Sequence, residues 1–350
     1  MVTDTATPVA INNQVHARMG RYSRVGSIAL LVLAVVLPFI PPFNGQDYQR
    51  WLVVAAYTAA LAVAFDFTAG YINIVNFGFA AFVGVGAYTS GLLAVDLHVS
   101  PWIGMVAGGL VSGFVGLLTG MLTLRLRGIY AAVMTWFVGL AVMGLARNLT
   151  EITRGSMGLN VPSLLESSDN LPYYYVILGL LVLTIVVLTF VIRSDLGLAF
   201  RAIGMNLQSA RASGINPTRF LVINFTLSCL FAGILGAFYA HYYGILTPEI
   251  MATSHTVEVL AIAYIGGRGS LWGPAVIAFP MTIAVELMRT NLSGLPGLHL
   301  VIYGLLLIVV MIFWPGGVAG VIRGATGRLQ SRWLAKASAE AGLAESVETA

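Results

Sequence analysis

Three acidic side chains interrupt apolar runs of this sequence, which makes them candidates for ion or proton chemistry. Asp66 closes one long run, Glu258 opens a short one, and Glu286 lies late in a third. A carboxylate is costly to bury inside a membrane, so such residues are by default candidates for function. The alternative is structural, because Asp66 and Glu258 lie near run ends that touch water, and Glu286 can pair with Arg289 one helical turn later.

Motifs for enzymatic or metal chemistry are absent. A phosphate-binding loop needs the pattern G-x-x-x-x-G-K-[ST], and the single lysine, Lys336, lies outside any such pattern. The sequence also lacks H-E-x-x-H, C-x-x-C and G-x-S-x-G. The single cysteine, Cys229, excludes an intrachain disulfide framework, and His98, His241 and His255 have no metal-ligand spacing. We therefore expect a chain that is not an enzyme, with no metal and no cofactor of its own.

A basic segment at 193–219 separates two long apolar runs. Apolar or small positions recur in it at helical spacing, at Leu198, Ala202, Met205 and Ser209. Gly214 followed by Pro217 is a helix stop signal, so the pattern predicts one short helix over residues 195–215. A basic, half-apolar helix beside a membrane is typical of a docking surface for a partner. Its arginines are Arg193, Arg201, Arg211 and Arg219.

Two glycine-rich stretches, 69–91 and 264–274, predict broken or re-entrant helices. Irregular backbone at membrane depth is tolerated only inside protein or beside water, so both stretches are candidates for the wall of a translocation pathway. Two alternatives stay open: the glycines, Gly84 and Gly86 among them, pack helices closely, and the asparagines cap helices. Compared as halves of an internal repeat, the stretches share little beyond glycine and aromatic residues. The pathway candidates are Asn73, Asn76, Gly78, Gly266, Gly267 and Arg268.

Composition places these residues in an all-α membrane protein. Hydrophobic residues make up 58% of the 350 residues and charged residues 9%, against about 25% charged residues in soluble domains. We expect a polytopic bundle of about 8–10 transmembrane helices with broken or re-entrant segments. The stretch Val257–Ile265 is too short to cross alone. The predicted spans are Ser27–Ile40, Trp51–Phe67, Phe77–Val95, Trp102–Leu124, Gly128–Ala146, Tyr173–Ile192, Phe220–Tyr243, Val257–Ile265, Leu271–Met288 and Leu298–Trp314.

The distribution of basic residues predicts the orientation. Thirteen of the 18 Lys and Arg residues fall in the N-terminal tail, at 125–127, in the segment 193–219, or after residue 320. The positive-inside rule places these regions, and both termini, in the cytoplasm. The expected organisation is a cytoplasmic tail over 1–26, a transmembrane domain over 27–315 that includes the 193–219 loop, and a cytoplasmic tail over 316–350.

Four ordered blocks, which cover most of residues 70–280, resemble the M-type permease subunit of branched-chain amino acid ABC transporters. In the second block Arg154 stands where the family usually has the first glycine of a Thr-Gly-Gly-like motif. The blocks are NIVNFGFAAFVGVGAYTSGLLA; LRLRGIYAAVMTWFVGLAVMGLARNLTEITRGSMGL; GLAFRAIGMNLQSARASGINPTRF with the following AGILGAFYAHYYGILTPE; and IAYIGGRGSLWGPAVIAF.

This resemblance implies a multi-pass subunit of an ABC importer in the bacterial plasma (inner) membrane. It would work with a second permease, two ATP-binding cassette subunits that bind the ATP, and a periplasmic or extracellular substrate-binding protein docked on the loop from about residue 147 to 172. The implied substrates are branched-chain amino acids or related small polar solutes. Alternatives are a urea, short-amide or sugar ABC permease, and an ion-coupled secondary transporter. The residues implied in ATPase coupling are Arg201, Ala210, Arg211, Gly214 and Ile215.

Overall fold

Each of the ten predicted apolar spans corresponds to a helix. The computed structural model describes residues 29–41, 45–123, 126, 128–165, 167, 169–291, 298–313 and 316–320. The expectations for residues 1–26 and for most of 316–350 lie outside this part of the chain. The helices that match the spans are Ala29–Phe39, which ends in the 3₁₀ turn η1 (Leu37–Phe39), α2 (Gln46–Ala69), α3 (Phe79–Asp96), α4 (Pro101–Thr123), α5 (Ile129–Asn148), α7 (Asn170–Arg193), α10 (Pro217–Tyr243), α11 (Thr253–Gly266), α12 (Trp272–Asn291) and α13 (Leu298–Phe313).

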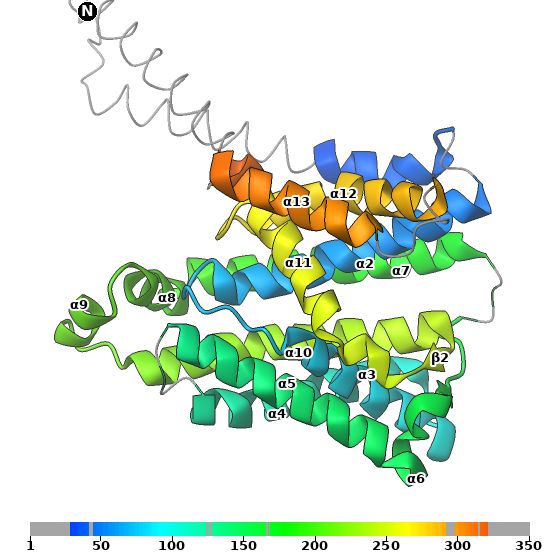
Figure 1. Ribbon diagram of the computed structural model, residues 1–350, viewed down its shortest axis with the longest axis horizontal. Helices are drawn as coiled ribbons and strands as arrows, with labels where there is room; N and C mark the ends of the chain where they lie inside the picture. The colour runs from blue at the N-terminus through cyan, green and yellow to red at the C-terminus, as the bar shows by residue number, and fades with distance from the viewer. Residues whose placement is uncertain are drawn as a thin grey trace, which may run out of the picture.

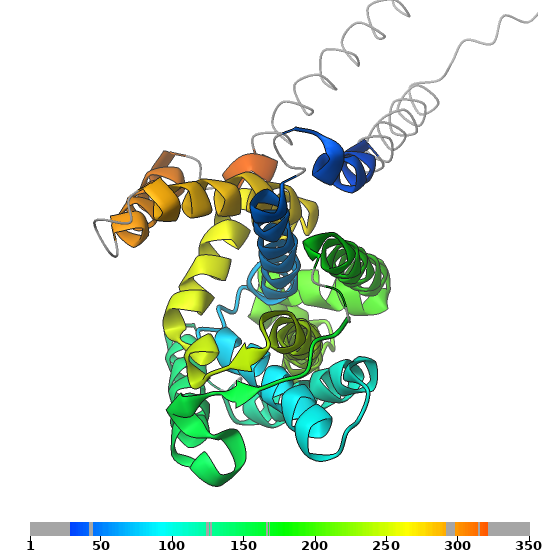
Figure 2. The same cartoon turned by 90° about the vertical axis from the view of Figure 1, so that its right-hand side faces the viewer.

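The structure confirms an all-α, multi-pass membrane architecture. Six of the described helices are long and apolar enough to cross a membrane, namely α2, α3, α4, α5, α7 and α10. At 14 residues, α11 is about 21 Å long, shorter than the roughly 30 Å hydrocarbon layer. The long helices lie roughly side by side along one direction (Figure 1) and appear nearly end-on in Figure 2.

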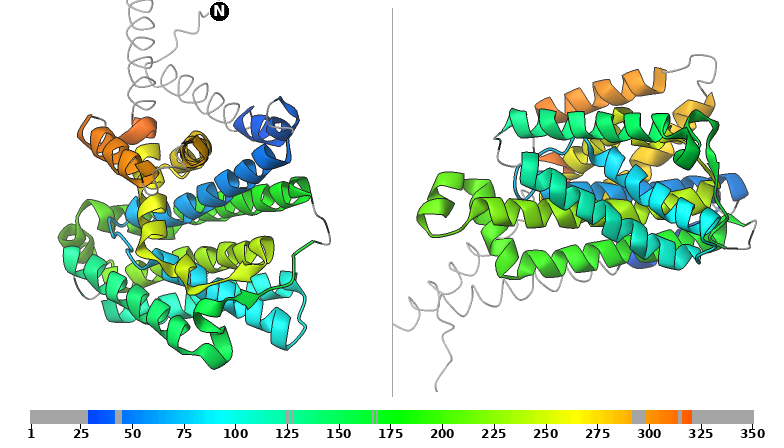
Figure 3. Two further views of the ribbon diagram at one scale, coloured as in Figure 1. Left: turned by 45° about the vertical axis from the view of Figure 1, so that its right-hand side comes forward. Right: turned by 90° about the horizontal axis from the view of Figure 1, so that it is seen from below.

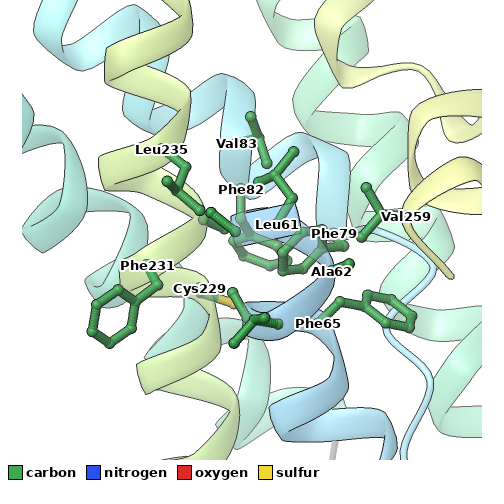
Figure 4. Packing of buried hydrophobic residues seen from close by; sticks show 14 of the residues in the cluster. Leu61, Ala62, Phe65, Phe79, Phe82, Val83, Cys229, Phe231, Leu235 and Val259 are labelled. Carbon is green, nitrogen blue, oxygen red and sulfur yellow. The ribbon is translucent and has the colours of Figure 1, made fainter. Parts of the chain in front are cut away.

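The centre of the bundle is formed by α2, α3 and α10. Phe65 of α2 meets Phe79 of α3 edge to face, with ring centroids 5.4 Å apart, and Phe82 meets Phe225 of α10 in the same way at 5.6 Å. Figure 4 shows Phe65, Phe79 and Phe82 of this cluster together with Cys229, a buried side chain.

Small residues let α3, α4 and α10 approach closely. A Cβ placed on Gly86 of α3 would lie 2.2 Å from the carbonyl oxygen of Gly233 in α10, so no larger residue fits there. Ser112 of α4 donates to the carbonyl oxygens of Phe82 and Cys229, each at 2.8 Å. The packing alternative for the glycines of the first stretch is therefore correct at Gly86, as expected where lipid leaves packing and hydrogen bonds to hold helices together.

Two helices begin inside the bundle instead of at its ends (Figures 1 and 3). Residues 70–78 leave the end of α2 without helical structure, and α3 then begins at Phe79. Likewise α11 follows β2 (Ile245–Leu246) and the 3₁₀ turn η3 (Pro248–Met251). The first turns of α3 and α11 meet, since the backbone N–H of Ala80 donates to Thr256 Oγ1 at 3.0 Å.

One end of the bundle is closed by a short sheet and by small helices. β1 (Leu159–Asn160) pairs antiparallel with β2, with Leu159 opposite Leu246. The helix α6 (Thr150–Thr153) and the 3₁₀ turn η2 (Gly155–Met157) precede it. Arg147, at the end of α5, and Glu249, in η3, form an ion pair of 2.6 Å. This pair links the segment that leads into β1 to the segment that follows β2. The described residues of the loop predicted to face outward thus include short helices and a strand.

Candidate functional site

The basic segment 193–219 forms two helices at the end of the bundle opposite β2 (Figure 1). They are α8 (Asp195–Met205) and α9 (Leu207–Ala212), so the prediction of one continuous helix over 195–215 is wrong. The interruption is at Asn206, whose side-chain oxygen accepts hydrogen bonds from the backbone N–H groups of Gln208 and Ser209 at 2.9 and 3.0 Å. Asparagine in this role starts a new helix.

Of the four positions predicted from spacing, two lie on the outer side of α8, Ala202 is half-buried against the bundle, and Ser209 belongs to α9. Leu198 and Met205 are 63% and 89% exposed. The residues that α8 buries against the bundle are a different set, among them Phe200 and Ile203. α8 therefore has one face packed on the bundle and two apolar side chains, Leu198 and Met205, exposed on its other side.

The five coupling candidates lie on and just beyond α8 and α9. Arg201 and Arg211 are exposed, and Ala210 is buried. Gly214 has a φ of +82°, the left-handed conformation in which glycine ends a helix, and the N–H of Ile215 returns to the carbonyl oxygen of Ala210 at 3.1 Å. The structure therefore gathers these candidates into one projecting unit.

The first broken stretch is attached to α8. Asn73 Nδ2 donates a 2.7 Å hydrogen bond to the carbonyl oxygen of Gly204. The two backbones touch nearby, because a Cβ on Gly204 would lie 2.2 Å from the carbonyl oxygen of Tyr71. The rings of Phe67 in α2 and Phe200 in α8 meet edge to face at 5.7 Å. The end of α2 and the stretch after it thus form one contact region with α8.

The other candidates of this stretch lie deeper. Asn76 is buried, and its side-chain oxygen accepts from the N–H of Gly78 at 3.1 Å, an Asx turn just before α3, while its Nδ2 has no partner among the described residues. Gly78 packs against α5, since a Cβ there would lie 2.2 Å from the carbonyl oxygen of Thr135. Asn76 therefore holds the start of α3, and Gly78 makes the contact with α5.

The second broken stretch is held by Asp66. This carboxylate is fully buried, and it accepts from the N–H of Gly269 at 2.9 and 3.0 Å and of Leu271 at 3.3 Å. The expectation that Asp66 touches water is wrong. Gly70, the residue directly after α2, lies against Gly269. A buried carboxylate needs such donors, so α2 fixes the turn between α11 and α12.

The remaining candidates surround this turn. Gly266 packs against the backbone of Pro274, and Gly267, with a φ of +105°, packs against residues 316–320. The guanidinium of Arg268 is exposed and lies 5.2 Å from the centre of the Tyr264 ring. The turn therefore lies at the end of the bundle that carries α8, and not in its middle.

The residues that join these parts are outside the pathway and coupling candidates. Asp66 carries a signal in the sequence, as a lone carboxylate in an apolar run, and Gly204 carries none. Within the described residues, no group of three or more His, Cys, Asp or Glu side chains could hold a metal ion.

The chain resembles known transport proteins over most of its length. Residues 48–311 match the family model described as branched-chain amino acid transport system / permease component. The high-affinity branched-chain amino acid transport system permease protein LivM of Salmonella typhimurium is 30% identical over 85% of this chain and 75% of its own length; its Escherichia coli K12 counterpart is 29% identical over the same shares. The permease protein LivH of Salmonella typhimurium is 24% identical over 79% of this chain and 95% of its own length. No solved structure matches the chain.

Proposed function

The chain belongs to the branched-chain amino acid permease family, and from this premise we propose that it moves branched-chain amino acids through the membrane as one of two permease subunits of an ABC importer. Relatives named as LivM and as LivH both match it, with higher identity to LivM, which supports the M-type assignment and pairing with a second permease of this family. A bundle with six helices long and apolar enough to cross a membrane supports a role in transport across that membrane.

The energy would come from separate ATP-binding subunits seated on α8 and α9. The observation that carries this part is the exposed surface of Leu198 and Met205 on a helix that is also bonded to the stretch after α2. A partner that pulls or rotates α8 would move the backbone of residues 71–73 with it. Through Asp66 the end of α2 would carry the same motion to the turn between α11 and α12, so that rigid helices rock between two states.

The orientation follows from the same proposal. The end with α8 and α9 would face the cytoplasm, in line with the basic residues, and both chain termini would lie there. The opposite end, with α6, β1 and β2, would receive the substrate-binding protein. The pathway candidates Asn76 and Gly78 would lie inside, while Asn73, Gly266, Gly267 and Arg268 would belong to the moving cytoplasmic end. ATP would be the only cofactor of the assembly and would bind to the partner subunits.

An uptake assay in bacteria tests the proposal. Cells without their own branched-chain amino acid uptake would express this chain with a second permease, the ATPase subunits and the binding protein from the same genome. We expect radiolabelled leucine to accumulate and uptake to vanish without this chain. Uptake of urea or ribose in place of leucine would contradict the substrate, and uptake without ATPase subunits would contradict the ABC mechanism.

A further inference from the structure

A cavity of about 380 Å³ lies between three apolar helices, namely the helix Ala29–Phe39, α7 and α12. The helix Ala29–Phe39 stands at the edge of the bundle (Figure 2). All the residues that line the cavity are apolar, and none carries a charge. Leu30 and Val276 in its wall are each 39% exposed, so the cavity opens at the surface of the bundle. Water needs several polar partners in such a space, so we expect an apolar occupant.

Hydrogen bonds fix the helix Ala29–Phe39 beside this cavity. Pro38 has no N–H group, so the carbonyl oxygen of Ala34, four residues earlier, lacks its usual partner within the helix. Tyr174, which is fully buried in α7, donates to this oxygen at 2.6 Å, and Tyr175 donates to the carbonyl oxygen of Val35 at 3.1 Å. Because these bonds attach the helix to α7, the cavity beside them is a defined part of the fold.

The cavity lies at the depth of the lipid tails. Its wall on α7 is formed near the middle of that helix, by Leu178, Leu181 and Ile185. Its wall on α12 extends from Trp272 to Pro280, a length of about 12 Å at the rise of an α-helix. One leaflet of the hydrocarbon layer is about 15 Å deep. A single acyl chain from one leaflet can therefore follow the whole wall.

The size and chemistry of the cavity exclude other occupants. One turn of an α-helix, roughly 10 Å across and 5.4 Å long, takes up about 420 Å³, which is more than the whole cavity of about 380 Å³. A polar solute would lose its hydration there without gaining a charged partner. An acyl chain is narrow and apolar, and its contacts with the walls supply the dispersion attraction that an empty cavity lacks.

We propose that one acyl chain of a membrane phospholipid occupies this cavity and forms part of the contact between the helix Ala29–Phe39 and the bundle. Three helices surround the bound chain, whereas lipid on the outer side of α7, at Leu183, meets an exposed surface. The bound lipid should therefore stay in place longer than the surrounding lipid. This inference goes beyond the proposed function and does not depend on which substrate is transported.

The first test uses a phospholipid that carries a diazirine near the end of one acyl chain. The full chain, with any subunits bound to it, would be illuminated in liposomes that contain this lipid, and the labelled residues identified by mass spectrometry. We expect Leu181 and Ile185 to be labelled at least fivefold more than Leu183, which lies at the same depth of α7 but is 48% exposed and outside the cavity. Equal labelling of the two sides would overturn the proposal.

Two neighbouring substitutions in α7 give a matched comparison. Val182 lines the cavity and Leu183 does not. We expect Val182→Trp, which fills the space, to lower the labelling of Leu181 and Ile185 at least fivefold, and Leu183→Trp to leave it within twofold of wild type. Labelling that Val182→Trp does not change would contradict the proposal.

A third measurement does not depend on the Val182 variant folding. A photoreactive phenylalanine analogue would replace Val276, which lines the cavity and is 39% exposed. We expect illumination of the protein in membranes to attach mainly phospholipid at this position, seen as an adduct of lipid mass. Adducts formed mainly with another subunit, or with another part of this chain, would assign the cavity to a protein segment and overturn the proposal.

Discussion

Asn73 and Gly204, 131 positions apart in the sequence, are joined by a 2.7 Å hydrogen bond from the asparagine side chain to the glycine carbonyl oxygen. The bond joins the non-helical stretch between α2 and α3 to α8, which projects from the bundle. Asn73 has a φ of +55°, a conformation that asparagine adopts more readily than most residues. Both its backbone and its side chain are therefore suited to this one contact.

Removal of this side chain should weaken coupling more than assembly. Asn73→Gly loses the hydrogen bond, worth about 1 kcal/mol, but keeps the left-handed backbone free of strain. We expect less leucine transported per ATP hydrolysed in proteoliposomes, with normal yield of the complex. Asn73→Leu, which adds backbone strain, should be worse. A normal ratio in Asn73→Gly would show that this bond does not transmit motion.

The backbone of Gly204 lies so close to that of Tyr71 that a methyl group at position 204 should not be tolerated. In Gly204→Ala the new Cβ would collide with the Tyr71 carbonyl oxygen, and overpacking of this kind costs about 1–3 kcal/mol. Gly179→Ala in α7 is the control, because a Cβ there meets nothing within 4 Å. We expect Gly204→Ala to lower the melting temperature of the purified complex and Gly179→Ala to leave it equal or higher. The reverse order would refute the packing at Gly204.

Arg154, where the resemblance implies a glycine, has a backbone conformation that favours glycine. Its φ is +59°, and its side chain is exposed. A non-glycine residue in this region stores about 1 kcal/mol of strain. Arg154→Gly should therefore raise the melting temperature slightly, and Arg154→Val should lower it. A loss of stability in Arg154→Gly would indicate that the arginine side chain makes a stabilising contact.

Positions 201 and 156 should lie on opposite sides of the membrane. Arg201 is exposed on α8, and Ser156 is exposed in η2 at the other end of the bundle. Single cysteines at these sites, with Cys229 replaced, should react with an impermeant thiol reagent from the inside and the outside respectively. Reaction of position 201 in intact cells would invert the proposed orientation.

Much of the fold follows from hydropathy, since all ten predicted spans are helical. Asn206 carries a signal for the break between α8 and α9, because asparagine is a strong N-cap residue. The helical spacing that continues to Ser209 favours one continuous helix instead, and this is why the prediction is wrong. The role of Asp66 was not readable, since its partners Gly269 and Leu271 lie more than 200 positions away. The contact between Gly204 and Tyr71, 133 positions apart, was likewise not readable from the sequence. Sequence periodicity reports which face of a helix is apolar, but not whether the bundle or a partner covers it, as Leu198 and Met205 show.

The most direct test of the account is whether the exposed apolar surface of α8 transmits ATP energy. Leucine accumulation and ATP hydrolysis would be measured together in proteoliposomes that contain the whole complex, for the wild type, Leu198→Asp and, as a control at an exposed position of α7, Val186→Leu. The account predicts ATP-dependent leucine accumulation by the wild type and the control, and its loss in Leu198→Asp, because a charge cannot be desolvated in an apolar docking contact. Full ATP-dependent accumulation by Leu198→Asp would contradict the account.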